Sequence, residues 1–165
     1  MTRQGEPILT GATERAGMQG LLDGGSAGEV AGRLHTSIAS LGQALARTRS
    51  RHDMPLRIVA VLALSVGELT VPAPRRVVRA LTSEQEAAVR TWATTPSSDL
   101  GDIGRRAHVP ASELKSLLRH AQQHLGFGLT TGWEAELRLL GAAVALGLVD
   151  PAESAQSLQA GSATQ

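Results

Sequence analysis

Two blocks of the 165-residue chain repeat one residue pattern, and this internal repeat constrains the fold more than any other feature. The blocks are residues 28–52 and 101–125. An offset of 73 positions joins every matched pair: Glu29/Asp102, Val30/Ile103, Arg33/Arg106, His35/His108, Leu41/Leu114 and Leu45/Leu118. Because a duplicated unit is expected to fold in the same way twice, the sequence predicts two similar halves.

Helical spacing of the apolar residues runs through both halves, and no segment alternates as a strand would. The sequence therefore predicts an all-α fold with eight helices in two sets of four. The first set is expected at residues 13–22, 27–34, 38–51 and 56–66, and the second at 83–93, 100–107, 110–124 and 132–146.

Pro72 and Pro74 exclude a continuous helix between the two sets. The sequence therefore predicts a first repeat at 8–69, a linker at 70–79, a second repeat at 80–150 and a tail at 151–165. The tail is composed of small and polar residues, and we expect it to be disordered.

Within each block, the pattern is that of a helix-turn-helix. The two leucines of each second helix are four positions apart, so they lie on one buried face. A small residue in the first helix, Ala31 or Gly104, allows the next helix to cross closely. His35 and His108 occupy equivalent places in the turn, where we expect a structural role. In DNA-binding proteins of this type, the second helix enters the major groove.

The second set, "ALTSEQEAAVRTWATTPSSDLGDIGRRAHVPASELKSLLRHAQQHLG", resembles the LuxR-type (GerE-like) four-helix DNA-binding domain. The matching positions are Leu81, Thr82, Ile103, Arg106, Val109, Leu125 and Gly126. The first set is similar through "EVAGRLHTS" and the apolar helix after it. The resemblance implies a recognition helix in each half and a closing helix that commonly pairs with its twin in a second chain.

The second recognition helix departs from the family pattern. It carries Pro110, Glu113 and Leu117 where polar or basic residues usually face DNA, and it keeps only Lys115. Glu113 is expected to repel phosphates. The first recognition helix carries its cations late and contains no acid. The candidate DNA-binding residues are Ser37, Ser40, Gln43, Arg47, Arg49, Arg51, Arg75, Arg76, Lys115 and Arg119. The alternative is a solvated helix end and a solvated linker.

The closing helix of the first half, 56–66, is apolar on nearly all sides and is therefore expected to be buried on all sides. The simplest arrangement packs it against the closing helix at 132–146. This gives two four-helix helix-turn-helix repeats packed as an intramolecular pseudo-dimer. The alternative is pairing between chains, which gives a homodimer.

Two classes of function follow. The leading hypothesis is a transcriptional regulator that binds double-stranded DNA through tandem helix-turn-helix units at an asymmetric site. The alternative is a scaffold that no longer binds DNA. It would act as a protein-interaction module, or as a small-molecule-binding or biosynthetic protein with a pocket between the repeats.

Other classes find little support in the composition. The chain has no Cys and a formal net charge of +1, and its longest apolar run, 58–64, is too short to span a bilayer. We expect a cytoplasmic protein without a membrane partner. No catalytic constellation or cofactor motif is visible, and His120 and His124 read as helix-end histidines, not as metal ligands.

Overall fold

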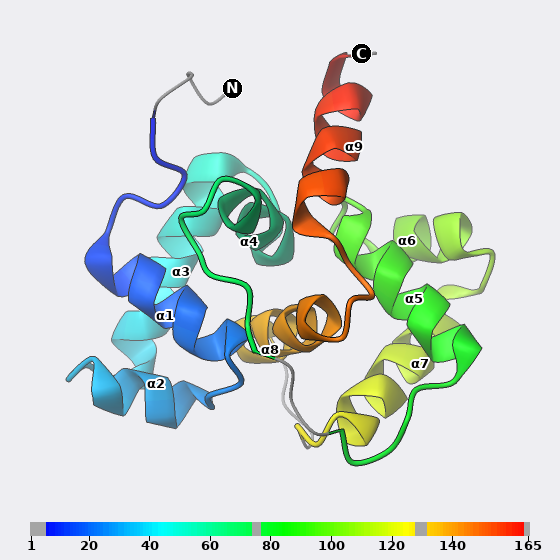
Figure 1. Cartoon of the computed structure of the whole chain (residues 1–165), viewed down its shortest axis with the longest axis horizontal. Coiled ribbons are helices and arrows are strands. Elements are labelled where there is room, and N and C mark those ends of the chain that lie inside the picture. Colours follow the sequence, from blue (N-terminus) through cyan, green and yellow to red (C-terminus); the bar gives the residue numbers. More distant parts are fainter. Residues whose placement is uncertain (1–5, 74–76, 128–131, 164–165) are drawn as a thin grey trace.

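Helices make up all the regular structure in the part of the chain that the computed structural model describes, residues 6–73, 77–127 and 132–163 (Figure 1). They are α1 (Ala12–Leu22), α2 (Ala27–Arg33), α3 (Ile38–His52), α4 (Leu56–Ser65), α5 (Ser83–Thr94), α6 (Leu100–Ala107), α7 (Ala111–His124), α8 (Gly132–Ala145) and α9 (Pro151–Ala163). The all-α prediction is confirmed, and each of the eight predicted helices agrees to within one residue at both ends.

Side-chain caps fix where several helices begin. The Ser26 hydroxyl accepts a hydrogen bond from the backbone N–H of Glu29, and the Glu29 carboxylate accepts one from Ser26. Thr82 and Gln85 form the same reciprocal pair at α5, and Ser37 caps α3. These caps satisfy backbone donors that a helix leaves unpaired at its first turn.

Helices α1–α3 and α5–α7 form two units with the same internal contacts. In each unit all three helices touch one another. The turn residues His35 and His108, 73 positions apart, both adopt the left-handed conformation, with φ of 54° and 60°. A Cβ on Gly104 would lie 2.6 Å from the carbonyl oxygen of Val109, so only glycine permits this crossing in α6. The predicted structural roles of these residues are confirmed.

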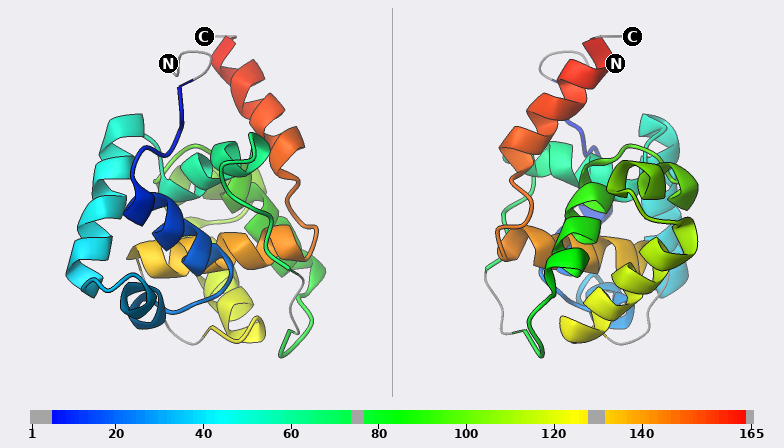
Figure 2. Two further views of the ribbon diagram at one scale, coloured as in Figure 1. Left: turned by 60° about the vertical axis from the view of Figure 1, so that its left-hand side comes forward. Right: turned by 90° about the vertical axis from the view of Figure 1, so that its right-hand side faces the viewer.

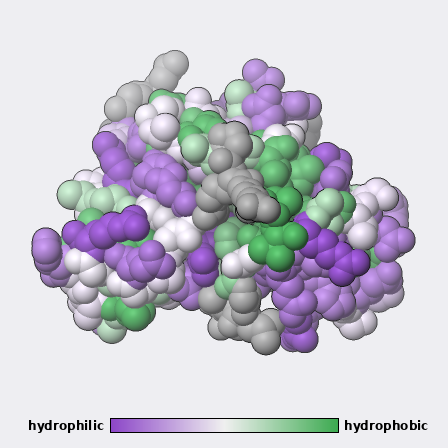
Figure 3. All heavy atoms as spheres, turned by 60° about the horizontal axis from the view of Figure 1, so that its bottom comes forward, coloured by the Kyte–Doolittle hydropathy of each residue, from purple (hydrophilic) through white to green (hydrophobic). Residues whose placement is uncertain are grey.

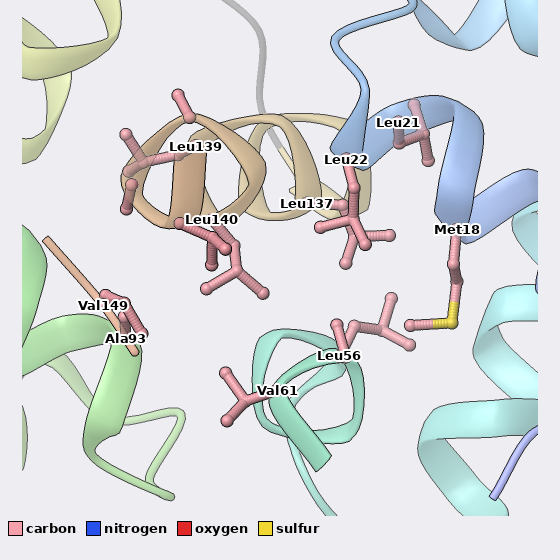
Figure 4. Close-up of a cluster of buried hydrophobic side chains, with 14 of the residues drawn as sticks. Met18, Leu21, Leu22, Leu56, Val61, Ala93, Leu137, Leu139, Leu140 and Val149 are labelled. Atoms are coloured by element: carbon pink, nitrogen blue, oxygen red, sulfur yellow. The ribbon is translucent and has the colours of Figure 1, made fainter. Parts of the chain in front are cut away.

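Helices α4 and α8 lie between the two units (Figure 1). They contact each other, as the sequence predicted, but α8 does not pack mainly on its own half. It packs extensively on α1 and only slightly on α5. Figure 4 shows the result: Leu137 of α8, Leu22 of α1 and Leu56 of α4 point into one cluster. The two halves therefore share a core.

That shared core is one cluster of buried apolar side chains that extends along the described chain from Ile8 to Val149. Helix α4 is buried on all its sides, since Leu56, Ile58, Val59, Val61 and Leu64 are all buried. Figure 4 shows Val61 of α4 and Leu140 of α8 at its centre, with Ala93 and Val149 beside them. Burial of side chains of this kind contributes about 1.5–3 kcal/mol each.

The disordered tail predicted at 151–165 is wrong for the residues that the structure describes, because Pro151–Ala163 form α9. Asp150 accepts hydrogen bonds from the backbone of Ala152 and Glu153 at its start. The helix packs along α4 and rises beyond the other helices (Figure 2). Ser154 and Ala155 are buried in this contact, and Leu158 is partly buried. Small residues therefore suffice to hold the helix in place.

The described parts of the predicted linker, 70–73 and 77–79, are not helical. Gln19 of α1 bonds both backbone groups of Thr70, and the backbone N–H groups of Val78 and Arg79 bond the carbonyl of His124. Val71 and Val78 are exposed.

On the face drawn in Figure 3, hydrophilic residues lie on both sides of a hydrophobic patch. Within the described residues, none of the helices is long and apolar enough to cross a membrane.

Candidate functional site

A cleft of about 1070 Å³ lies between the two units. Its walls come from α3 and α7, the two helices that the sequence analysis predicts to be recognition helices. Residues of α8, the beginnings of α4 and α6, and the end of α5 complete it. Residues from both halves are therefore needed to build this site.

The α3 wall is formed by Gly42, Ala46 and Arg49, which lie on one face of the helix at spacings of four and three. Gly42 lies against the indole of Trp133, the second residue of α8. A Cβ on Gly42 would be 3.1 Å from the indole nitrogen. The glycine thus allows α8 to approach α3, at the position equivalent to Lys115 in α7.

The α7 wall carries Lys115, Leu118, Arg119 and Gln122 at helical spacing. Leu118 is buried, whereas Lys115 and Arg119 are exposed. The same face therefore offers an apolar surface toward the core and two cationic groups toward solvent.

Arg57, at the start of α4, lines the cleft and links the two halves through its hydrogen bonds. Its side chain is 3% exposed and donates to the carbonyls of Trp92, Thr95 and Ser97 at 2.7, 2.9 and 2.5 Å. It also donates to the Glu136 carboxylate at 2.9 Å, and it lies 5.1 Å from the centre of the Trp92 ring. Arg57 thus bonds carbonyls at and beyond the end of α5, which a helix leaves unpaired.

Positive charge dominates the cleft. Its basic side chains other than Arg57 are Arg49, Lys115 and Arg119, and in the described chain none of the three has a hydrogen bond or ion pair through its side chain. The carboxylate that lines it, Glu136, is bound to Arg57. A cleft lined by charges of one sign concentrates the electrostatic field and attracts the opposite ion.

The structure brings some of the predicted DNA-binding residues together. Arg49, Lys115 and Arg119 line the cleft, whereas Gln43 and Arg47 are exposed on α3 outside it. Ser37 and Ser40 are also exposed, and their hydroxyls bond each other at 3.0 Å in the cap of α3. Arg75 and Arg76 lie outside the described residues.

Arg51 is engaged elsewhere. Its guanidinium lies 2.6 Å from the carboxylate of Glu14 on α1 and also donates to the carbonyl of Ile8. Burial alone would raise the pKa of Glu14, but hydrogen bonds from Arg51, Thr48 and the backbone of Thr10, together with the charge of Arg51, outweigh it and lower that pKa. The same pair raises the pKa of Arg51. Its charge is therefore neutralised within the first half.

Residue patterns alone missed three side chains of the cleft: Arg57, Trp92 and Trp133. The two tryptophans are the only ones in the chain, and both line the cleft. Their scarcity in a core of leucine, valine and alanine was the available signal. No local pattern marks Arg57, because its partners on α5 and α8 are 35 to 79 positions away. Burial lowers the pKa of Arg57, and Glu136 opposes that effect.

Within the described residues, no group of three or more His, Cys, Asp or Glu side chains could hold a metal ion. His120 lines the cleft, and His124 lies one helical turn further along α7. The arrangement is suited to binding an anion through cations and apolar contacts.

No protein-family model matches the chain, and no match was found among curated proteins or solved structures.

Proposed function

We propose that the protein is a DNA-binding regulator built from two divergent LuxR-type helix-turn-helix repeats, joined as a pseudo-dimer within one chain. The offset of 73 residues between α2–α3 and α6–α7 supports the duplication, as do the matching contacts within the two three-helix units. The positive φ angles of His35 and His108, in equivalent turns, support the duplication as well.

One observation carries the proposal: the free cations of the two recognition helices converge. Arg49 on α3 lies across one cleft from Lys115 and Arg119 on α7, and Arg47 is exposed nearby on α3. Unpaired arginine and lysine side chains on exposed helices are the groups that bind DNA phosphates and release counterions. The repeats differ in these residues, so the preferred DNA site is asymmetric.

Duplex binding over a range of salt concentrations tests the proposal. Fluorescence anisotropy with a labelled duplex of mixed sequence measures the affinity. Four phosphate contacts give a slope of log K against log salt of about −3.6. The double variant Arg47→Gln/Arg49→Gln and the double variant Lys115→Gln/Arg119→Gln should each lose about half of that slope.

The matched control removes the same charge from α6, in the double variant Arg105→Gln/Arg106→Gln. Both side chains are exposed on α6, outside the cleft. This control should keep most of the affinity. Absence of duplex binding at low salt, or equal losses in all three double variants, would refute the proposed interface.

A further inference from the structure

The cleft between the two units has features that binding of a duplex leaves unused. A volume of about 1070 Å³ corresponds to a pocket for a small molecule, for which typical volumes are about 300–1000 Å³. A duplex would contact the exposed cations Arg49, Lys115 and Arg119 and would leave the apolar interior of the cleft unfilled. The interior of the cleft therefore needs its own explanation.

Apolar side chains form the inner surface of the cleft. Ile103, Leu118 and Leu139 are buried and line it, and Leu100 is partly buried beside them. Trp133 is half-buried and presents its indole in the cleft, whereas Trp92 is 7% exposed and is covered by Arg57. Apolar and aromatic linings of this kind bind the flat body of an organic ligand.

Cationic side chains stand on both walls around this surface. Arg49 approaches from α3, and Lys115 and Arg119 approach from α7. In the described chain their side chains have no partner of their own, and the lining acid Glu136 is held by Arg57. A charged group on a ligand would therefore meet guanidinium and ammonium donors that are free to bind it.

Together these features define a ligand class. We infer that the cleft between α3 and α7 binds a small organic anion with a flat aromatic body. The aromatic part contacts Trp133 and the leucines, and the acid group pairs with Arg49, Lys115 and Arg119. The site lies between the halves, so residues of both halves are needed to build it. This inference does not depend on DNA binding.

Intrinsic fluorescence reports on the site directly, because the two tryptophans of the chain both line the cleft. The probe is 8-anilinonaphthalene-1-sulfonate, an aromatic anion, added to the folded full-length protein. The expected result is saturable binding of one probe per chain, with quenching of the tryptophan emission. The neutral analogue N-phenyl-1-naphthylamine has the same aromatic body and should bind about tenfold more weakly, because it lacks the acid group.

Variants locate the bound probe. Lys115→Gln and Arg119→Gln should each weaken binding of the anilinonaphthalene sulfonate, together by about tenfold, because charge-assisted contacts are lost. Ala46→Phe places a ring in the cleft and should abolish saturable binding. All three positions are exposed, so the folded state is retained, and thermal melting by circular dichroism verifies this.

Arg47→Gln is the matched control, because it removes the same charge from α3 at an exposed position outside the cleft. It should leave the affinity for the probe unchanged while weakening duplex binding. The inference is overturned by any of three results: no saturable binding, equal affinity for the neutral analogue, or equal losses from Arg47→Gln and from the cleft variants.

Discussion

Gly141 of α8 lies directly against the backbone of Leu22 at the end of α1, although 119 positions separate the two residues. A Cβ on Gly141 would be 2.6 Å from the carbonyl carbon of Leu22, and closer still to its oxygen. Gly141 lies in the middle of α8, where glycine normally costs stability relative to alanine. The close approach of α8 to α1 explains why this position is a glycine.

Gly141→Ala should therefore destabilise the protein. The new methyl group meets backbone atoms, which cannot rotate away, so α8 and α1 must separate. We expect a loss of about 2–4 kcal/mol in the free energy of unfolding, measured by urea denaturation. Gly32→Ala is the control, because nothing lies within 4 Å of its Cβ position in α2. This control should gain about 0.5–1 kcal/mol from helix propensity, and similar effects of the two substitutions would contradict the packing.

Arg57→Met tests the tie between the halves. Methionine keeps much of the side-chain volume but leaves three carbonyls and the Glu136 carboxylate without their donor. Loss of one partner from a buried ion pair typically costs about 3–5 kcal/mol. Emission of Trp92 should also change, because the guanidinium lies over its ring.

For comparison, Arg106→Met changes an exposed arginine of α6 and should alter stability by less than about 0.5 kcal/mol. If Arg57→Met unfolds at the same urea concentration as the unchanged protein, Arg57 does not hold the halves together.

Much of this architecture could be predicted from local sequence. Helix bounds depend mainly on neighbouring residues, so all of α1–α8 could be predicted to within one residue. The partner of α8 could not be found in that way. Leu137 and Leu140 indicate a buried face, but they do not say whether α1 or α5 covers it.

Helix α9 was missed because its buried face consists of small residues. Pro151, Ser154, Ala155 and Leu158 follow the helical spacing of three, four and seven, and Asp150 precedes a proline as in many helix starts. Only Leu158 among them is a large apolar residue. Composition therefore predicted disorder. In the structure, α9 instead packs along the apolar helix α4 and covers part of its surface.

The pair of Glu14 and Arg51 should make stability depend on acid pH. The pKa of Glu14 in the folded state lies below its ordinary value of 4.5. Its contribution is therefore fully present above that pH and is lost as pH falls through the lowered pKa. Glu14→Gln should cost about 1 kcal/mol at neutral pH and show a shallower loss of stability on acidification.

Urea unfolding at about pH 7 and about pH 3 measures this difference. Glu153→Gln supplies the control, since its carboxylate is exposed on α9. If Glu14→Gln and the unchanged protein lose stability in parallel as pH falls, the ion pair does not contribute to the pH dependence.

His35 and His108 should respond to glycine in the same way, because both adopt positive φ in equivalent turns. A residue with a Cβ pays about 1–2 kcal/mol in the left-handed region, whereas glycine does not. We expect His35→Gly and His108→Gly each to raise the free energy of unfolding by about 0.5–1 kcal/mol. His120→Gly, within α7, should lower it by about 0.5–1 kcal/mol. Opposite signs at His35 and His108 would argue against equivalent turns.

Glu113 distinguishes α7 from α3, which contains no acidic residue, and its removal tests the proposed DNA interface from the opposite direction. The carboxylate is exposed in the first turn of α7, on the helix that carries Lys115 and Arg119. Near phosphates it repels the duplex, so Glu113→Gln should strengthen binding by about two- to fivefold at low salt. The gain should shrink as salt screens the repulsion. Glu153→Gln removes the same charge from α9 and should leave the affinity unchanged. Equal gains in both variants would mean that only net charge matters, and that α7 does not face the DNA.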